Sequence, residues 1–210
     1  MSTTTSTPHL AGSAPPAVRR GFRIPEEIGV IVALVAMMAI IGFARPRFLN
    51  PINLFSLLGN TTFLGMLAIG MVFLLAIREI DLSVGWMFNF SAVFAALLMV
   101  AGIDPWLAAF AGVLFGAGLG LVNGLIAITL RLPAIIVTLG TYSMFQGLSL
   151  IANKGRAIVP SDQSSSFFSV ISTKLYGVVP VAALVFIVLA LAMHVVLHRT
   201  RFGYRVQAVG

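Results

Sequence analysis

The sequence contains no cysteine and few charged residues, and each shortage excludes a class of protein. Without cysteine, the chain has neither disulfides nor thiolate metal ligands. Charged residues make up 9% and hydrophobic residues 59% of its 210 residues. An average soluble domain is about 25% charged and about 45–50% apolar. So few charges cannot cover a surface that water solvates, and we therefore expect the bilayer to be the solvent of this chain.

Signatures of catalysis and of nucleotide binding are also missing. The two lysines, Lys154 and Lys174, do not lie in a Gly-x-x-x-x-Gly-Lys-Ser/Thr P-loop, and neither His-Glu-x-x-His nor Gly-x-Ser-x-Gly occurs. His194 and His198, four residues apart, could share a metal, but no carboxylate lies near them in the sequence. We expect their rings to reach towards the membrane surface instead. The sequence thus predicts no catalytic residue, no metal site and no cofactor.

The apolar residues are grouped into six runs. A spanning helix needs about 20 residues, so five runs are long enough and the first is at the short limit. All six acidic residues fall outside the runs or at their ends, because a charge at a helix centre costs about 2.5–3.5 kcal/mol. The pattern predicts an all-α, polytopic transmembrane bundle of about six spans. The runs are Ile28–Ala44, Leu54–Ile77, Leu82–Ile103, Trp106–Leu130, Pro133–Ala152 and Val178–Leu197.

The loops between the runs indicate orientation and domain organisation. With the amino terminus inside, the cytoplasmic loops carry more basic residues than the outer ones, which favours this orientation. The net charge of +7 is therefore topogenic and does not indicate nucleic-acid binding. We expect residues 1–27 to form a disordered cytoplasmic leader. A transmembrane domain should follow at 28–199, with a long polar outer loop at 153–177, and then a cytoplasmic segment at 200–210.

The fourth run carries glycines at a four-residue step: Gly112, Gly116, Gly120 and Gly124. This spacing places them on one ridge of a helix, where small residues let a neighbouring backbone approach closely. The ridge predicts close helix packing within the bundle, and a dimer interface is the alternative.

Uncharged polar residues inside the runs are candidates for a solute path. No Asp, Glu, Lys or Arg lies in mid-run, which argues against a proton relay or an ion-coupling site. Neutral amides and hydroxyls suit a neutral, hydroxyl-rich solute, although hydrogen bonds between helices explain the asparagines equally well. The candidates are Asn60, Asn89, Asn123, Thr138, Thr141 and Gln146.

A short motif precedes the third predicted helix. It consists of Ile80, Asp81, Leu82, Ser83, Val84 and Gly85. Either Asp81 or Ser83 can cap the helix, and Gly85 allows close backbone approach in its first turn. Taken alone, the motif predicts only a well-capped turn.

Three ordered stretches resemble the ribose-type permeases of bacterial ABC importers, a superfamily that also holds branched-chain amino-acid permeases. Gly65–Gly85 ends in the hallmark Ile-Asp-Leu-Ser-Val-Gly. Gly118–Gly147 contains Asn-Gly at Asn123 and the Pro-x-x-Ile-Val-Thr-Leu-Gly-Thr that begins at Pro133. Thr200–Gly210 matches the family's Thr-x-Phe-Gly-Arg…Ala-x-Gly, apart from one inserted tyrosine.

The resemblance implies the pore subunit of an ATP-driven importer for a neutral sugar or polyol, a multi-pass protein of the bacterial inner membrane. Its implied partners are a second permease subunit, ABC ATPase subunits and an extracytoplasmic solute-binding protein. The candidate ATPase contacts are Arg201, Phe202, Gly203 and Arg205. Family members are longer, so we expect a truncated chain that ends before the coupling helix. An ion-coupled secondary carrier and a non-transporting membrane scaffold are the alternatives.

Overall fold

Most of the residues in the computed structural model, which describes residues 27–160, 163–175, 177 and 179–210, are helical. The predicted leader, apart from the backbone of Glu27, lies outside the described residues. The chain divides into two units, one that ends at Phe48 and one from Leu49 to Gly210. In the first unit, α1 covers Glu27–Ala44. It ends before Arg45-Pro46 because the residue preceding a proline is pushed out of the helical conformation.

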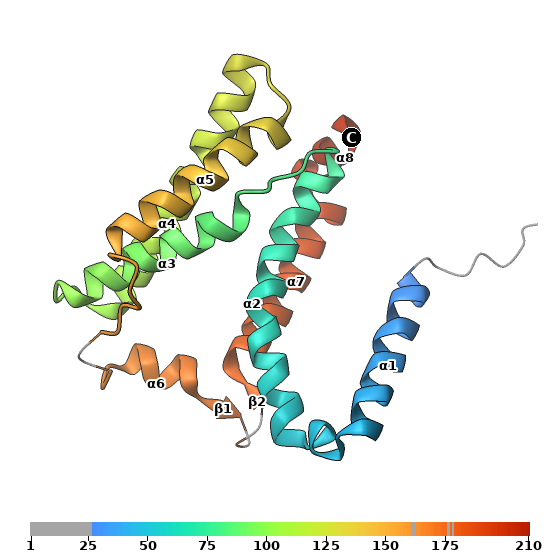
Figure 1. Cartoon of the computed structure of the whole chain (residues 1–210). Helices are drawn as coiled ribbons and strands as arrows, with labels where there is room; N and C mark the ends of the chain where they lie inside the picture. Colours follow the sequence, from blue (N-terminus) through green and yellow to red (C-terminus); the bar gives the residue numbers. More distant parts are fainter. Residues whose placement is uncertain (1–26, 161–162, 176, 178) are drawn as a thin grey trace, which may run out of the picture. The chain divides into compact units, whose positions relative to one another are not determined.

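The second unit contains the remaining long helices (Figure 1). A short 3-10 helix, Pro46–Leu49, leads into it. Its elements are α2 (Pro51–Ala76), α3 (Val84–Val100), α4 (Pro105–Leu130), α5 (Ala134–Ala152), α6 (Ser166–Ser172), β1 (Lys174–Leu175), β2 (Val179–Pro180), α7 (Val181–Arg199) and α8 (Arg201–Val209). The strands β1 and β2 pair antiparallel, so the predicted outer loop 153–177 contains a short helix and one strand of this hairpin.

Proline and a capping side chain begin two of the long helices. Both α2 and α4 start with proline, whose missing N–H costs nothing at the first helical position. The side-chain oxygen Oδ1 of Asn50 accepts a hydrogen bond from the N–H of Ile52 at 2.9 Å. The Asp104 carboxylate accepts from the N–H groups of Trp106 and Leu107 at 3.0 and 3.2 Å. These bonds satisfy donors that a helix leaves free at its amino end.

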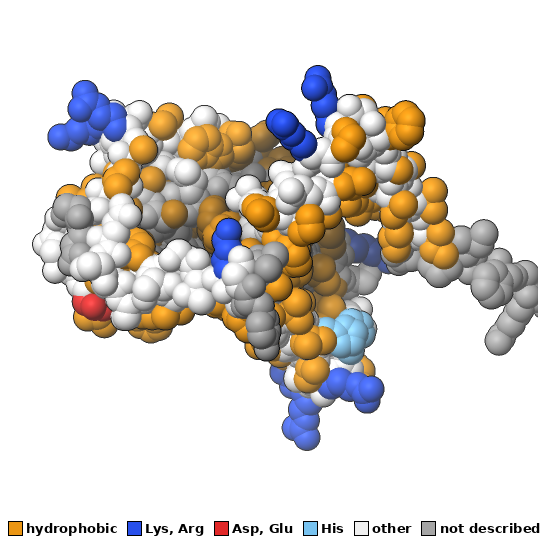
Figure 2. Space-filling model, turned by 90° about the horizontal axis from the view of Figure 1, so that it is seen from below, with side chains coloured by type: hydrophobic (Ala, Val, Ile, Leu, Met, Phe, Trp, Pro, Cys, Tyr) orange, Lys and Arg blue, Asp and Glu red, His pale blue; other side chains and the backbone are white. Residues whose placement is uncertain are grey.

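The expectation of an all-α, membrane-spanning bundle is confirmed. Among the described residues, α2, α4, α5 and α7 are long and apolar enough to cross a bilayer, while Ile28–Ala44 and α3 are apolar but shorter. Large hydrophobic side chains are exposed on all of these helices, and they cover much of the face seen in Figure 2. An exterior of this kind suits hydrocarbon rather than water.

Two helices are shorter at one or both ends than their apolar runs. The third run extends from Leu82 to Ile103, but α3 covers only Val84–Val100, directly after Ser83, one of the two expected capping residues. The Asp81 carboxylate accepts from the N–H of Ser83, which favours a turn there, and Gly102 has a φ of +89° that stops the helix. Helix α7 begins at Val181, after the strand that contains Pro180; Val178, the first residue of the sixth apolar run, lies outside the described residues.

Helices α3, α4 and α5 pack together, and α2 packs with α7 and α8. Glycine allows the close approach of α4 to α3. A Cβ on Gly112 would lie 2.9 Å from the Cβ of Ala95, and one on Gly116 would lie 2.8 Å from the Ser91 hydroxyl. A Cβ on Gly120 would lie 3.7 Å from the Met87 sulfur, whereas a Cβ on Gly124 would meet nothing within 4 Å. The ridge thus contacts α3 over three of its four glycines.

We predict that Gly112→Ala destabilises the protein and that Gly118→Ala does not. The new methyl group at 112 overlaps Ala95 and should cost about 1–3 kcal/mol. Gly118 lies on the same helix with nothing within 4 Å of the added Cβ, so alanine there should gain up to about 1 kcal/mol of helix propensity. Denaturant unfolding in mixed micelles measures both, and equal stability of the two variants would contradict this packing.

Candidate functional site

The segment between α2 and α3 is not helical, and its side chains fold back onto its own backbone. The Asp81 carboxylate oxygen Oδ1 accepts from the backbone N–H of Ser83 at 2.7 Å and from the Ser83 hydroxyl at 2.6 Å. Ser83 is the residue that precedes the first turn of α3, and it is fully buried. Its side chain makes no capping bond to α3. The acid therefore holds the serine in place instead of capping the helix directly.

The same segment is tied to α4 and α5. The Asn123 amide of α4 donates through Nδ2 to the Ser83 hydroxyl oxygen at 2.8 Å. The Leu82 N–H donates to the Thr138 hydroxyl of α5 at 3.1 Å, and the Glu79 carboxylate accepts from the Ala134 N–H at 3.2 Å. We name this set the Ser83 joint; it consists of Glu79, Asp81, Leu82, Ser83, Asn123, Ala134 and Thr138.

The hydrogen bond from the Ala134 N–H to Glu79 caps helix α5. Ala134 is the first residue of α5, and the preceding Pro133 offers no side-chain cap. Its N–H would be one of the free donors of a helix end. The Glu79 carboxylate therefore caps α5 from another part of the chain, with its negative charge at the positive end of the helix dipole.

A second polar contact joins α3 to α5 nearer the opposite end of α5. The Asn89 carbonyl oxygen accepts from the Ser149 hydroxyl at 2.7 Å, and Ser149 is fully buried. The rings of Trp86 and Tyr142 meet edge to face, with centroids 6.3 Å apart. We call this line of contact between α3 and α5, formed by Trp86, Asn89, Tyr142 and Ser149, the seam of α3 and α5. Because Asn89 itself is exposed, one side of the seam presents an amide beside two aromatic rings that carry polar groups.

The predicted path residues fall into three groups. Asn123, Thr138 and Thr141 are buried between α3, α4 and α5. Asn89 is exposed and Gln146 half-buried, on α3 and α5. Asn60 is exposed on α2, which packs with a different set of helices. The sequence missed Glu79 and Ser149 as partners, because nothing local indicates that a loop carboxylate caps a helix some 55 residues away.

The segment after α7 forms a helix that the sequence analysis did not predict. The Thr200 hydroxyl accepts from the Gly203 N–H at 3.2 Å and donates to the Val196 carbonyl at 2.5 Å. A Cβ on Gly203 would overlap the Leu197 carbonyl, and Gln207 donates to that carbonyl at 2.7 Å. The capping threonine and the apolar Phe202, Val206 and Val209 at helical spacing were the available signals.

The four candidate ATPase contacts therefore differ in position. Arg201, Phe202 and Arg205 are exposed on α8. The Phe202 ring lies 6.3 Å from that of Phe73 on α2. Gly203 is buried against α7 and cannot offer a surface; it allows α8 to approach the end of α7.

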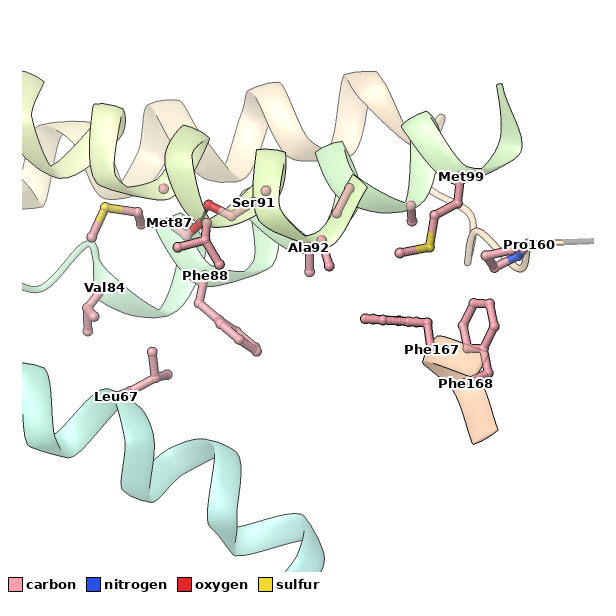
Figure 3. Close-up of a pocket in the computed structure, with 16 residues that line it drawn as sticks. Leu67, Val84, Met87, Phe88, Ser91, Ala92, Met99, Pro160, Phe167 and Phe168 are labelled. Carbon is pink, nitrogen blue, oxygen red and sulfur yellow. Dashed lines mark hydrogen bonds between the residues drawn. The ribbon is translucent and has the colours of Figure 1, made fainter. Parts of the chain in front are cut away.

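A cavity of about 550 Å³ lies among α2, α3, α4 and α6, where Leu67, Phe88, Met99, Phe167 and Phe168 point towards it (Figure 3). Among the described residues that line it, Ser91 has the only polar side chain, and its hydroxyl donates to the Met87 carbonyl. These residues offer a hydroxyl-rich solute almost no hydrogen-bond partners.

The two histidines of α7 stack with ring centroids 4.4 Å apart, and both are exposed. Nδ1 of His198 lies 3.1 Å from the His194 carbonyl. Within the part of the chain that the structure describes, no three potential metal ligands come together.

We predict that Thr138→Val is more destabilising than Thr141→Val. Both threonines are buried on α5, and the change of shape is the same. Valine at 138 removes the acceptor of the Leu82 N–H, which should cost about 1–3 kcal/mol. Thr141 donates only to the carbonyl of Thr138 on its own helix, so its loss should cost less. Unfolding in mixed micelles measures the difference, and equal losses would contradict a role for Thr138 in the Ser83 joint.

Comparisons with known proteins agree on a family. Residues 53–210 match the family described as branched-chain amino acid transport system / permease component. The chain is 32% identical to the ribose import permease protein of Bacillus subtilis (strain 168), over 89% of this chain and 58% of that protein. It is 33% identical to the L-arabinose ABC transporter permease protein of Azospirillum brasilense, over 95% and 58%.

The D-allose transport system permease protein of Escherichia coli (strain K12) is 30% identical, over 88% of this chain and 56% of that protein. The chain thus spans a little over half the length of these relatives. No solved structure matches it. Since the family match covers most of the chain and includes the Ser83 joint, α8 and every long helix except α1, the chain belongs to the family of permease components typified by the branched-chain amino acid transport system.

Proposed function

We propose that this chain is a transmembrane pore subunit of an ATP-driven importer for a neutral sugar or polyol. One observation carries the proposal: the polar side chains that α3, α4 and α5 bring together inside the apolar helices are amides and hydroxyls. The two carboxylates of the joint are engaged within the protein, Asp81 by Ser83 and Glu79 by the Ala134 N–H. Amides and hydroxyls match the donors and acceptors of a sugar without favouring a charged solute.

The named relatives support the same class of solute. Three of them are permeases for ribose, L-arabinose and D-allose. These relatives favour an importer over the ion-coupled carrier and the scaffold that the sequence left open. In this proposal, ATP is hydrolysed by partner ATPase subunits, a binding protein delivers the solute from outside, and a second permease subunit completes the pore.

The exposed seam of α3 and α5 is the proposed solute-facing surface. Asn89 offers its amide there, and Gln146 lies one helical turn from both Tyr142 and Ser149 on the same side of α5. Trp86 and Tyr142 add ring faces, which pack against the apolar faces of a sugar ring. The buried Thr138, Thr141 and Asn123 hold the seam in shape.

The inner surface for the ATPase is proposed at α8. Arg201 and Arg205 lie one turn apart and are exposed, and Gly203 fixes α8 to the end of α7. We take the amino terminus to be cytoplasmic, as the basic loops favour, and infer from the alternation of spans that α8 lies on the cytoplasmic side and Lys154 and Arg156 on the outer side.

We predict that Arg201→Glu/Arg205→Glu reduces co-purification of the ATPase subunit at least tenfold, because both charges of the proposed contact are reversed. Lys154→Glu/Arg156→Glu changes the net charge equally, on exposed residues after α5, and should leave co-purification unchanged. The measurement is the ATPase recovered per permease from membranes that contain both subunits, together with ATP-dependent uptake of labelled ribose. Equal recovery in the two variants would contradict the proposed contact.

A further inference from the structure

Helix α3 begins well inside the layer formed by α4 and α5. Asn123, which bonds Ser83, lies seven residues before the end of α4 at Leu130, a distance of about 10 Å along the helix. Thr138, which bonds Leu82, lies four residues after the start of α5, or about 6 Å. The ends of α4 and α5 accordingly extend beyond the start of α3 (Figure 1). Where α4 and α5 cross the bilayer, the residues between α2 and α3 therefore bring non-helical backbone into the membrane.

Non-helical backbone at this depth is tolerated only where protein or water satisfies it. The Ser83 joint supplies acceptors for the N–H groups of Leu82 and Ser83. The first turn of α3 has further N–H groups that no carbonyl of the same helix can accept. These donors, and the positive end of the α3 dipole, therefore lie at the joint and not at the membrane surface.

The proton of the Ser83 hydroxyl fixes the orientation of the Asn123 amide. Ser83 has one hydroxyl proton, which it donates to Asp81 at 2.6 Å. Its oxygen can then only accept, so the group of Asn123 that faces it at 2.8 Å must be the donor Nδ2. Turning the amide over would place two acceptors against each other. The Asn123 carbonyl oxygen Oδ1 consequently points away from Ser83.

That oxygen is buried and has no hydrogen-bond partner among the described residues, and Asn123 as a whole is only 5% exposed. An unsatisfied acceptor in a low-dielectric interior is costly, so a donor is needed there. The carboxylate of Asp81, which accepts from Ser83, and the first N–H groups of α3 belong to the same region of the fold. An anion would be repelled by the carboxylate, whereas a neutral O–H group can donate to Oδ1 and accept from an N–H.

We propose that the Ser83 joint contains a binding site for a neutral hydroxyl group, which donates to Asn123 Oδ1 at the amino end of α3. The hydroxyl belongs either to a water molecule or to a sugar or polyol in transit. Only the second source rests on the proposed function; the site itself requires only that α4 and α5 cross the bilayer.

The chain contains no cysteine of its own, so a single introduced cysteine can be labelled selectively. Two glycines are matched positions for such a cysteine. Gly85 lies in the first turn of α3, and Gly124 lies beside Asn123 on α4, at a similar depth. Both are exposed, and an added Cβ meets nothing within 4 Å at either position. The single variants Gly85→Cys and Gly124→Cys are reconstituted into lipid vesicles and treated with a charged, water-soluble methanethiosulfonate reagent, with and without ribose.

We expect Gly85→Cys to react at least tenfold faster than Gly124→Cys, because a hydroxyl site at the start of α3 requires access from water. Slower reaction in ribose would identify a solute hydroxyl as the ligand, and an unchanged rate would identify water. Equally slow reaction of both variants would overturn the site. The labelling needs no ATPase and no uptake, so its failure is distinguishable from a failure of the proposed function.

A density map of the reconstituted protein provides the second measurement. A peak within hydrogen-bond distance of Asn123 Oδ1 is expected. A map that shows ordered side chains at Ser83 and Asn123 but no such peak would overturn the proposal, whatever the labelling result.

Discussion

Every backbone polar group that enters hydrocarbon must find a partner within the protein, and the structure around α3 depends on this constraint. Long helices such as α2, α4, α5 and α7 satisfy it internally. The segment before α3 cannot, because its N–H groups and carbonyls are not in a helical ladder. It is held against α4 and α5 by the Ser83 joint, which provides side-chain acceptors for the N–H groups of Leu82 and Ser83 and bonds Ser83 to Asn123.

The Ser83 joint depends on the close packing of α3 against α4. Gly112 and Gly116 let α4 approach Ala95 and Ser91 of α3, and Phe94 stacks on Phe115 with ring centroids 4.4 Å apart. This approach allows a short amide such as Asn123 to reach Ser83. Beyond the joint, the bond between Asn89 and Ser149 sets the seam of α3 and α5, so the position of the proposed solute surface follows from the same contacts.

The sequence was sufficient for features that depend on local pattern. The apolar runs predict the helices, and proline with a capping residue marks the starts of α2 and α4. The four-residue step of the glycines predicts close packing of α4 within the bundle, and the structure gives α3 as the partner. These signals work because a membrane helix satisfies its own backbone and is sorted by hydropathy alone.

Features that depend on distant partners could not be predicted. Asp81 reads equally well as a helix cap and as the acceptor of a turn, and only its bond to Ser83 decides that α3 starts later than its apolar run. The roles of Glu79 and Ser149 require the positions of Ala134 and Asn89, which local sequence does not encode. Asn60 satisfied the same criterion as Asn123 but lies on another group of helices. The close approach at Gly203 depends likewise on how α8 turns back onto α7.

The central claim is that Ser83 and Asn123 form one hydrogen-bonded unit that joins α3 to α4. A double-mutant cycle with Ser83→Ala and Asn123→Leu, measured as the free energy of unfolding in mixed micelles, tests it most directly. We expect each single variant to be destabilised by about 1–3 kcal/mol, since each leaves a buried polar group without its partner. The double variant should be less destabilised than the sum of the two by about 0.5–1.7 kcal/mol. Strict additivity of the two losses would contradict the account.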